Sequence, residues 1–192
     1  MFDIDLGGTG PVILDVPGAI PSKLLVALGK DGKIYLVDRS NLGGVGKQVA
    51  AEKVAKNSII NAAAAYTTTR GTYVVFKGNG INCPPGQVGD LTAVRIIPGA
   101  PPRVETAWCA QQNGKGSPMV TTTDGHNEAI VWSIGAEGDN RLHGFDGDTG
   151  KIVYAGGGPG DVIGLVRRFY TPILAGGRIY IAADGVVKAF VR

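Results

Sequence analysis

The chain has 192 residues, which is enough for a single domain with a substantial core. Its 44% hydrophobic and 18% charged residues exclude a disordered chain, and the scattered basic residues behind the net charge of +3 do not form a nucleic-acid surface. No apolar run reaches the roughly 18 residues of a membrane span, and no signal-peptide pattern opens the sequence. Glycine occurs 31 times, about twice its usual share, which is typical of many tight turns.

Short apolar segments separated by Gly, Asp and Asn residues run along the whole chain. Segments of about 4–8 residues bounded by such turns are typical of β-strands, and Asp-Gly between two of them favours a hairpin. One segment, 46–56 (GKQVAAEKVAK), also fits a short helix, so the all-β class depends on the other segments. We expect strands, in chain order, at residues 10–13, 24–28, 34–38, 47–54, 61–69, 73–76, 91–95, 103–109, 117–120, 130–134, 142–146, 151–155, 171–174, 179–182 and 187–191.

Three of these segments begin alike, with a small or hydroxyl residue, then proline, then aliphatic residues. Their prolines, Pro11, Pro118 and Pro172, are 107 and 54 residues apart, so the first interval is nearly twice the second. This spacing predicts a fourth copy near residue 64, where 61–69 (NAAAAYTTT) lies without its proline. Proline suits the first position of a strand because the hydrogen-bond ladder does not need its missing N–H there.

A second series of aligned strands sets the length of the repeat. The series comprises 34–38, 91–95, 142–146 and 187–191, whose last residues are 57, 51 and 45 apart. Repeats of this length with four strands each are typical of β-propeller blades. We therefore predict an all-β, single-domain β-propeller with about four blades of four antiparallel strands. The expected blades are approximately residues 10–56, 60–110, 116–158 and 168–192, the last completed by residues 1–6 (MFDIDL).

One repeat has a family signature. Residues 142–151 (LHGFDGDTGK) resemble the pyrroloquinoline-quinone-type repeat, in which a strand ending in Asp is followed by a turn ending Thr-Gly-Lys. Residues 33–39 (KIYLVDR) and 178–191 look like weaker copies. The chain is similar to the C-terminal part of longer, mostly secreted bacterial proteins with quinoprotein-alcohol-dehydrogenase-like β-propellers. The family's docking tryptophan at the end of the fourth strand is matched by Trp108, and Tyr154 is its equivalent in the next repeat.

The chain departs from this family in two ways. Quinone-dependent members use an eight-bladed ring and commonly an adjacent pair of cysteines that packs on the cofactor. Here only four blades are expected, and the two cysteines, Cys83 and Cys109, are not adjacent. These departures argue against a bound quinone. The ring would close through residues 1–6, or two chains would meet as a homodimer with eight blades.

The loops expected to meet on the channel face carry the candidate binding site. Mixed carboxylate and guanidinium groups there could hold a cation or an anionic ligand, or could be solvated loop charges. The ligand classes that fit are a small molecule, a polysaccharide or a protein. The candidate calcium ligands are Glu137, Asp139 and Asn140. The candidate ligand-binding residues are Glu137, Asp139, Asn140, Arg141, Arg167 and Arg168.

Candidate catalytic groups are few. His143 with Asp146 could act as general acid and base, although a half-buried structural histidine fits the same position. No Gly-x-Ser-x-Gly setting selects a serine nucleophile. Cys83 and Cys109 allow either a disulfide or two partly buried thiols, and a disulfide would favour an oxidising compartment. Together with the family resemblance, this predicts a periplasmic or secreted protein.

Three functions are consistent with the sequence. The first is a non-catalytic binding or scaffold module that takes its ligand on the channel face. The second is a calcium-dependent hydrolase of the lactonase type, in which Glu137, Asp139 and Asn140 hold a metal that polarises a carbonyl and activates water. The third, implied by the family resemblance alone, is a quinone-dependent oxidoreductase.

Overall fold

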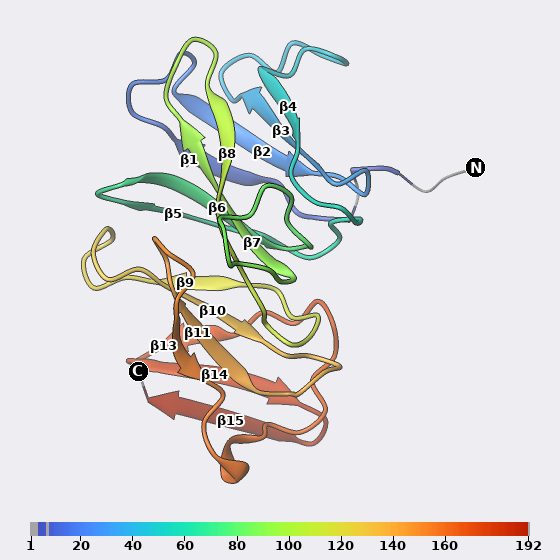
Figure 1. The fold of residues 1–192 in the computed structure, drawn as a ribbon, viewed down its shortest axis with the longest axis vertical. Helices are drawn as coiled ribbons and strands as arrows, with labels where there is room; N and C mark the ends of the chain where they lie inside the picture. The colour runs from blue at the N-terminus through green and yellow to red at the C-terminus, as the bar shows by residue number, and fades with distance from the viewer. Residues whose placement is uncertain (1–3, 7, 192) are drawn as a thin grey trace.

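A computed structural model describes residues 4–6 and 8–191 of the chain and confirms the all-β class. Its strands form four antiparallel sheets, and within each sheet the strands pair in chain order. In Figure 1 the sheets follow one another along the long axis, from the blue first sheet to the red last sheet. This is the arrangement of successive propeller blades. Within the described residues, no helix is long and apolar enough to cross a membrane.

The bounds of the strands are as follows. The first sheet contains β1 (Val12–Asp15), β2 (Lys23–Leu28), β3 (Lys33–Asp38) and β4 (Ala50–Lys53). The second contains β5 (Ala64–Thr68), β6 (Gly71–Lys77), β7 (Leu91–Ile97) and β8 (Arg103–Ala110). The third contains β9 (Met119–Thr121), β10 (Ile130–Ile134), β11 (Leu142–Asp146) and β12 (Ile152–Ala155). The fourth contains β13 (Ile173–Ala175), β14 (Arg178–Ala183) and β15 (Val186–Val191), and a short 3-10 helix, η1 (Pro159–Asp161), precedes it.

The ambiguous segment 46–56 contains a strand and not a helix. β4 pairs antiparallel with β3, with Ala51 opposite Tyr35, so pairing with an existing sheet edge decides its conformation. The repeated prolines lie one residue outside the predicted position: β1, β9 and β13 each begin directly after their proline. A proline at this position lies before the first hydrogen-bonded residue of the strand, so the sheet does not need the N–H that proline lacks.

Three apolar layers hold the sheets together, one between each consecutive pair. Strand β6 shows how a sheet serves two layers, because Val74 and Phe76 belong to the first layer and Tyr73 and Val75 to the second. This follows from the alternation of side chains along a strand. All four side chains are almost completely buried. The third layer joins the last two sheets, through residues such as Ile134 of β10 and Ile181 of β14.

The layer between the second and third sheets is built around Trp108, the predicted docking tryptophan. This side chain is fully buried, and its Nε1 donates a hydrogen bond to the carbonyl of Gly147 at 2.7 Å. The hydroxyl of Tyr66 donates to the same carbonyl at 2.6 Å. Gly150 closes the turn at φ +70, and a Cβ there would lie 2.7 Å from the tryptophan ring. The Asp-Gly-Asp-Thr-Gly turn therefore forms the surface against which the Trp108 side chain packs.

A disulfide between Cys83 and Cys109 ties the long loop between β6 and β7 to strand β8. The same loop carries Gln87, whose side chain accepts a hydrogen bond from the Cys109 N–H and donates one to the Thr149 carbonyl. The loop is thereby fixed both to its own sheet and to the turn of the next one.

The predicted closing strand is not formed by residues 4–6, the part of residues 1–6 that the structure describes. The Asp5 carbonyl accepts a hydrogen bond from the Lys30 N–H, at the turn between β2 and β3. In the described chain, β15 pairs only with β14. The outer face of this last sheet bears Ile173, Val187 and Val191, which are 64%, 67% and 79% exposed. Closure of the ring is not observed, and the homodimer stays a prediction.

We expect the shared carbonyl of Gly147 to couple its two donors energetically. Tyr66→Phe alone should cost about 1 kcal/mol in the free energy of unfolding, because Trp108 still satisfies the carbonyl. Tyr66→Phe combined with Trp108→Phe should cost about 1–2 kcal/mol more than the two single changes together, because a buried carbonyl is then left without a partner. Urea denaturation of the four proteins measures this difference.

A matched control is Trp132→Phe, because the Trp132 Nε1 donates to a separate acceptor, the Thr121 hydroxyl. Its effect should add to that of Tyr66→Phe. Strict additivity in the Trp108 cycle as well would show that the Gly147 carbonyl does not couple the two side chains.

Candidate functional site

The predicted ligand-binding residues lie on the loop between β10 and β11 and on the connection that leads into β13. Two non-glycine residues of this loop, Glu137 and Asn140, adopt left-handed backbone conformations with φ +53. Such conformations are costly for residues with a Cβ and persist only where the surroundings hold them. The contacts of this loop therefore decide what its side chains do.

Glu137 is held by two cations. Its carboxylate accepts hydrogen bonds from Nε and Nη2 of Arg168, at 3.0 and 2.7 Å, and lies 3.3 Å from Nζ of Lys115. The bonds from the Arg168 guanidinium hold the pKa of Glu137 at about 2, well below the ordinary value of 4.5. Glu137 and Arg168, two of the predicted ligand-binding residues, therefore form an ion pair with each other.

Asp139 pairs with His143. The two side chains meet at 2.9 Å between Nε2 and Oδ2, and His143 is almost fully buried. Asn113 donates to the same Asp139 oxygen at 3.2 Å. The structure does not bring His143 and Asp146 together, because side chains three positions apart leave opposite faces of strand β11. Asp146 instead accepts hydrogen bonds from N and Oγ1 of Thr149 and stabilises its own turn.

The other three candidates fix the chain that follows the third sheet. The Asn140 side-chain carbonyl accepts from the Val166 N–H at 3.0 Å, and Arg141 Nη1 donates to the carbonyls of Gly156 and Gly158. Arg167 pairs with Asp184 on the turn between β14 and β15. Arg167 and its neighbour Arg168 therefore reach in different directions, toward the loops of two adjacent sheets. The six residues form a polar seam between the third and fourth sheets.

The three predicted calcium ligands do not point at a common centre. Glu137, Asp139 and Asn140 direct their oxygens at three different partners, namely Arg168, His143 and a backbone N–H. Within residues 4–6 and 8–191, no group of three or more His, Cys, Asp and Glu side chains is placed to hold a metal ion. The geometry thus assigns these three residues a structural role.

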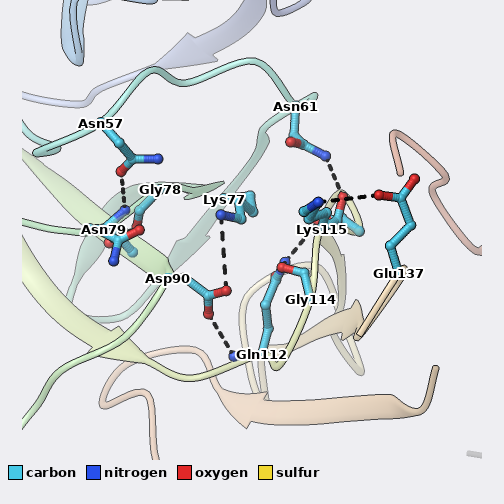
Figure 2. A network of polar contacts seen from close by, with 12 residues as sticks. Asn57, Asn61, Lys77, Gly78, Asn79, Asp90, Gln112, Gly114, Lys115 and Glu137 are labelled. Atoms are coloured by element: carbon cyan, nitrogen blue, oxygen red, sulfur yellow. Dashed lines mark hydrogen bonds and ion pairs between the residues drawn. The ribbon is translucent and has the colours of Figure 1, made fainter. Parts of the chain in front are cut away.

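The connections that enter each sheet lie against one another. Asn61, before β5, donates to the carbonyl of Lys115 at 2.8 Å, and Figure 2 shows Lys115 between Asn61 and Glu137. Farther along the same network, Asp90 accepts from the Gln112 N–H (Figure 2). Ser117, before β9, donates its N–H to the carbonyl of Tyr170, before β13. Three successive entry segments are therefore bonded in a row.

A cavity of about 700 Å³ opens beside this row. Its lining comes from the segments before β1, β5 and β13 and from the turn between β2 and β3, so residues of the first and last units face the same space. These segments belong to the loops that were expected to meet on the channel face, although the residues differ from those predicted, and we call this space the channel-face cavity. The lining residues are Gly8, Gly10, Lys30, Ser58, Ile60, Ala62 and Phe169.

Phe169 is the unusual residue of this cavity. It has φ +67, a conformation rare for an aromatic residue, and its side chain is 53% exposed. Both neighbours are anchored: Arg168 by Glu137, and Tyr170 by bonds from the N–H groups of Ser117 and Ala182. The polar seam therefore holds Phe169 in a strained conformation at the cavity.

Phe169 is not among the residues predicted from the sequence. Its available signal is the aromatic pair Phe169-Tyr170, which directly precedes the third Pro-aliphatic strand entry. The predicted residues Arg167 and Arg168 lie in the same segment as Phe169, and their ion pairs position this segment. That the segments before β1 and β13 share one cavity depends on how the sheets stack, which no local pattern encodes.

Comparisons with known proteins add little beyond the fold. No family model and no curated protein match the chain. Among solved structures, it is similar to the β-propeller domain of Cps50 (Swd1) from Myceliophteria thermophila, with 11% identity and a TM-score of 0.44. The similarity covers 75% of this chain and 40% of that one, so the chain spans less than half its length. The four antiparallel sheets define a β-propeller-like all-β domain, and no comparison assigns it to the pyrroloquinoline-quinone family.

We expect the Glu137–Arg168 pair to stabilise the protein in a pH-dependent manner. A carboxyl whose pKa is lowered on folding contributes fully above its unfolded value near 4.5, and this contribution is lost as the pH falls toward 2. Glu137→Gln should therefore lower the melting temperature at pH 7, and the difference from wild type should shrink between about pH 4.5 and 2. Thermal unfolding followed by circular dichroism at several pH values tests this.

The control for this series is Glu52→Gln, at an exposed position on β4 that forms no ion pair with any described residue. It should show little effect at any pH. A Glu137→Gln difference that stays constant down to pH 2 would contradict the role given to the pair.

Proposed function

We propose that this domain is a non-catalytic, quinoprotein-like β-propeller module that binds a polysaccharide in the channel-face cavity. The observation that carries the proposal is Phe169, an exposed aromatic ring at a cavity of about 700 Å³, held there by anchors on both sides. An aromatic face packs well against the apolar C–H face of a sugar ring. Its fixed conformation lowers the entropy lost on binding.

The remainder of the cavity suits the same ligand. Gly8 and Gly10 leave one wall without side chains, Ile60 and Ala62 add apolar surface, and Ser58 supplies a hydroxyl. A concave, partly apolar site with a few polar groups is the usual form of a ligand pocket. A polysaccharide presents both kinds of surface, and its length allows neighbouring residues outside the cavity to take part.

The charged residues support a binding role over a catalytic one. A calcium-dependent lactonase would need the oxygens of Glu137, Asp139 and Asn140, which here bond to Arg168, His143 and the Val166 N–H. The Cys83–Cys109 disulfide supports the proposal that the protein works in the periplasm or outside the cell, because disulfides persist in oxidising compartments. Polysaccharides are accessible to a protein in either place.

Substitution of Phe169 separates binding from folding. Phe169→Gly removes the ring but suits φ +67, so the melting temperature should stay the same or rise. Affinity for a bound saccharide should fall roughly two- to tenfold with the loss of the aromatic contact. Isothermal titration with β-1,4-glucan, chitin and alginate oligosaccharides provides the measurement.

Phe169→Trp is the matched variant, because it keeps an aromatic face at the same place and should retain binding. The proposal fails if wild type binds none of these saccharides. It also fails if Phe169→Gly binds as tightly as wild type.

A further inference from the structure

A second groove lies at the opposite ends of the strands from the channel-face cavity. It has a volume of about 440 Å³ and runs along the turn between β5 and β6 and past the end of β7. The charged side chains in its lining are two arginines, and the lining contains no carboxylate. The lining residues are Val16, Pro17, Thr67, Thr68, Thr69, Arg70, Gly71, Thr72, Arg95, Ile96, Ile97 and Pro98.

The backbone of the turn accommodates one of these arginines. Gly71 has φ +138, and a Cβ built on it would lie 3.2 Å from Cδ of Arg95. The Arg95 side chain therefore passes closely over a position that has no side chain of its own. Arg70 is the preceding residue of the same turn, so one guanidinium group from this turn and one from β7 line the groove.

Both guanidinium groups keep donors available. Arg70 lies 3.8 Å from Asp148, and Arg95 lies 3.6 Å from Glu105, which are ion-pair distances too long for hydrogen bonds. Within the described residues, neither guanidinium donates a hydrogen bond, whereas Arg168 and Arg141 each donate at least two. Exposed ion pairs of this length contribute little to stability. A ligand could therefore bind these donors at little cost to the fold.

Hydroxyl groups complete the lining. Thr67 and Thr72 lie opposite each other on β5 and β6 with their hydroxyls 3.2 Å apart, and Thr69 is at the exposed tip of the turn. Thr68 and Thr72 already have acceptors, since Thr68 donates to Asp148 at 2.7 Å and Thr72 donates to the Asp15 carbonyl at 3.4 Å. Guanidinium groups combined with hydroxyl donors are well matched to the several acceptor oxygens of an anion.

We propose that this groove is a binding site for a tetrahedral oxyanion, a sulfate or phosphate group, held by Arg70 and Arg95. The site is separate from the channel-face cavity and does not depend on the function proposed for it. The anion would be either a free inorganic ion or the ester group of a larger molecule, and both present the same oxygens to the two arginines.

The experiment titrates sodium sulfate and sodium phosphate into 15N-labelled protein at constant ionic strength, with chloride as the reference anion. We expect saturable shifts of the amide signals of residues 67–72 and 95–97 with sulfate or phosphate but not with chloride. Arg70→Gln combined with Arg95→Gln should weaken the affinity at least about tenfold, because two charge-assisted contacts are lost.

Two single variants distinguish a binding role from a merely structural one. Arg103→Gln removes an exposed arginine of the same sheet that does not line the groove, and it should leave the affinity unchanged. Glu105→Gln removes the carboxylate beside Arg95 and should tighten anion binding, an increase that loss of a structural ion pair would not produce. Equal responses to sulfate, phosphate and chloride, or unchanged affinity in the double variant, would overturn the proposal.

A further titration with an O-sulfated disaccharide and its desulfated counterpart identifies the source of the anion. Tighter binding of the sulfated sugar than of free sulfate, lost in the double arginine variant, would assign the site to an ester group on a saccharide. Equal affinities would assign it to the free ion. Phe169→Gly should leave the affinity for inorganic sulfate unchanged, so this proposal and the one for the channel face can fail separately.

Discussion

A four-stranded antiparallel sheet with apolar side chains on both faces must be covered on both sides, and this requirement shapes the molecule. The second sheet shows it most clearly, because alternate residues of β6 enter two different apolar layers. Each layer joins sheets whose strands are consecutive in the chain. The stack grows by the same step three times, which accounts for the repeat seen in the sequence.

The buried side chain of Trp108 makes the packing of the second sheet on the third specific. Trp108 and Tyr66 share the Gly147 carbonyl, so the second sheet recognises a particular turn of the third. Burial raises the pKa of Tyr66 well above its ordinary value, which keeps the hydroxyl a donor. Apolar packing provides most of the driving force for stacking, and these hydrogen bonds set the register in which the sheets meet.

Between the third and fourth sheets, ion pairs and hydrogen bonds of loop residues set how the two sheets meet. The loop between β10 and β11 holds the segment that precedes β13 through Glu137, Asn140 and Arg141. These side chains, whose chemistry would also suit a metal or a substrate, here position the backbone of the segment between β12 and β13. Their consequence for function is indirect, since they fix Phe169 beside the channel-face cavity.

Much of the architecture could be predicted from local patterns. Alternation of apolar residues and turn chemistry located the strands, because both act over a few residues. The segment 142–151 identified a turn of defined shape, and Trp108 was recognised as the residue that docks. The closing role of residues 1–6 stays a prediction. Residues 4–6 lie at the turn between β2 and β3, and the choice between two distant sheet edges depends on where those edges lie.

The sequence by itself determined the all-β class, the order of the strands and their grouping into four repeated units, because these follow from short-range periodicity. Only the tertiary structure decided which charged residues meet. It paired His143 with Asp139, committed Glu137 to Arg168, and brought Phe169 to a cavity shared with the first sheet. The contacts of Glu137 and Phe169 join residues from different loops or sheets, and their distances depend on the stacking of whole sheets, which no local pattern records.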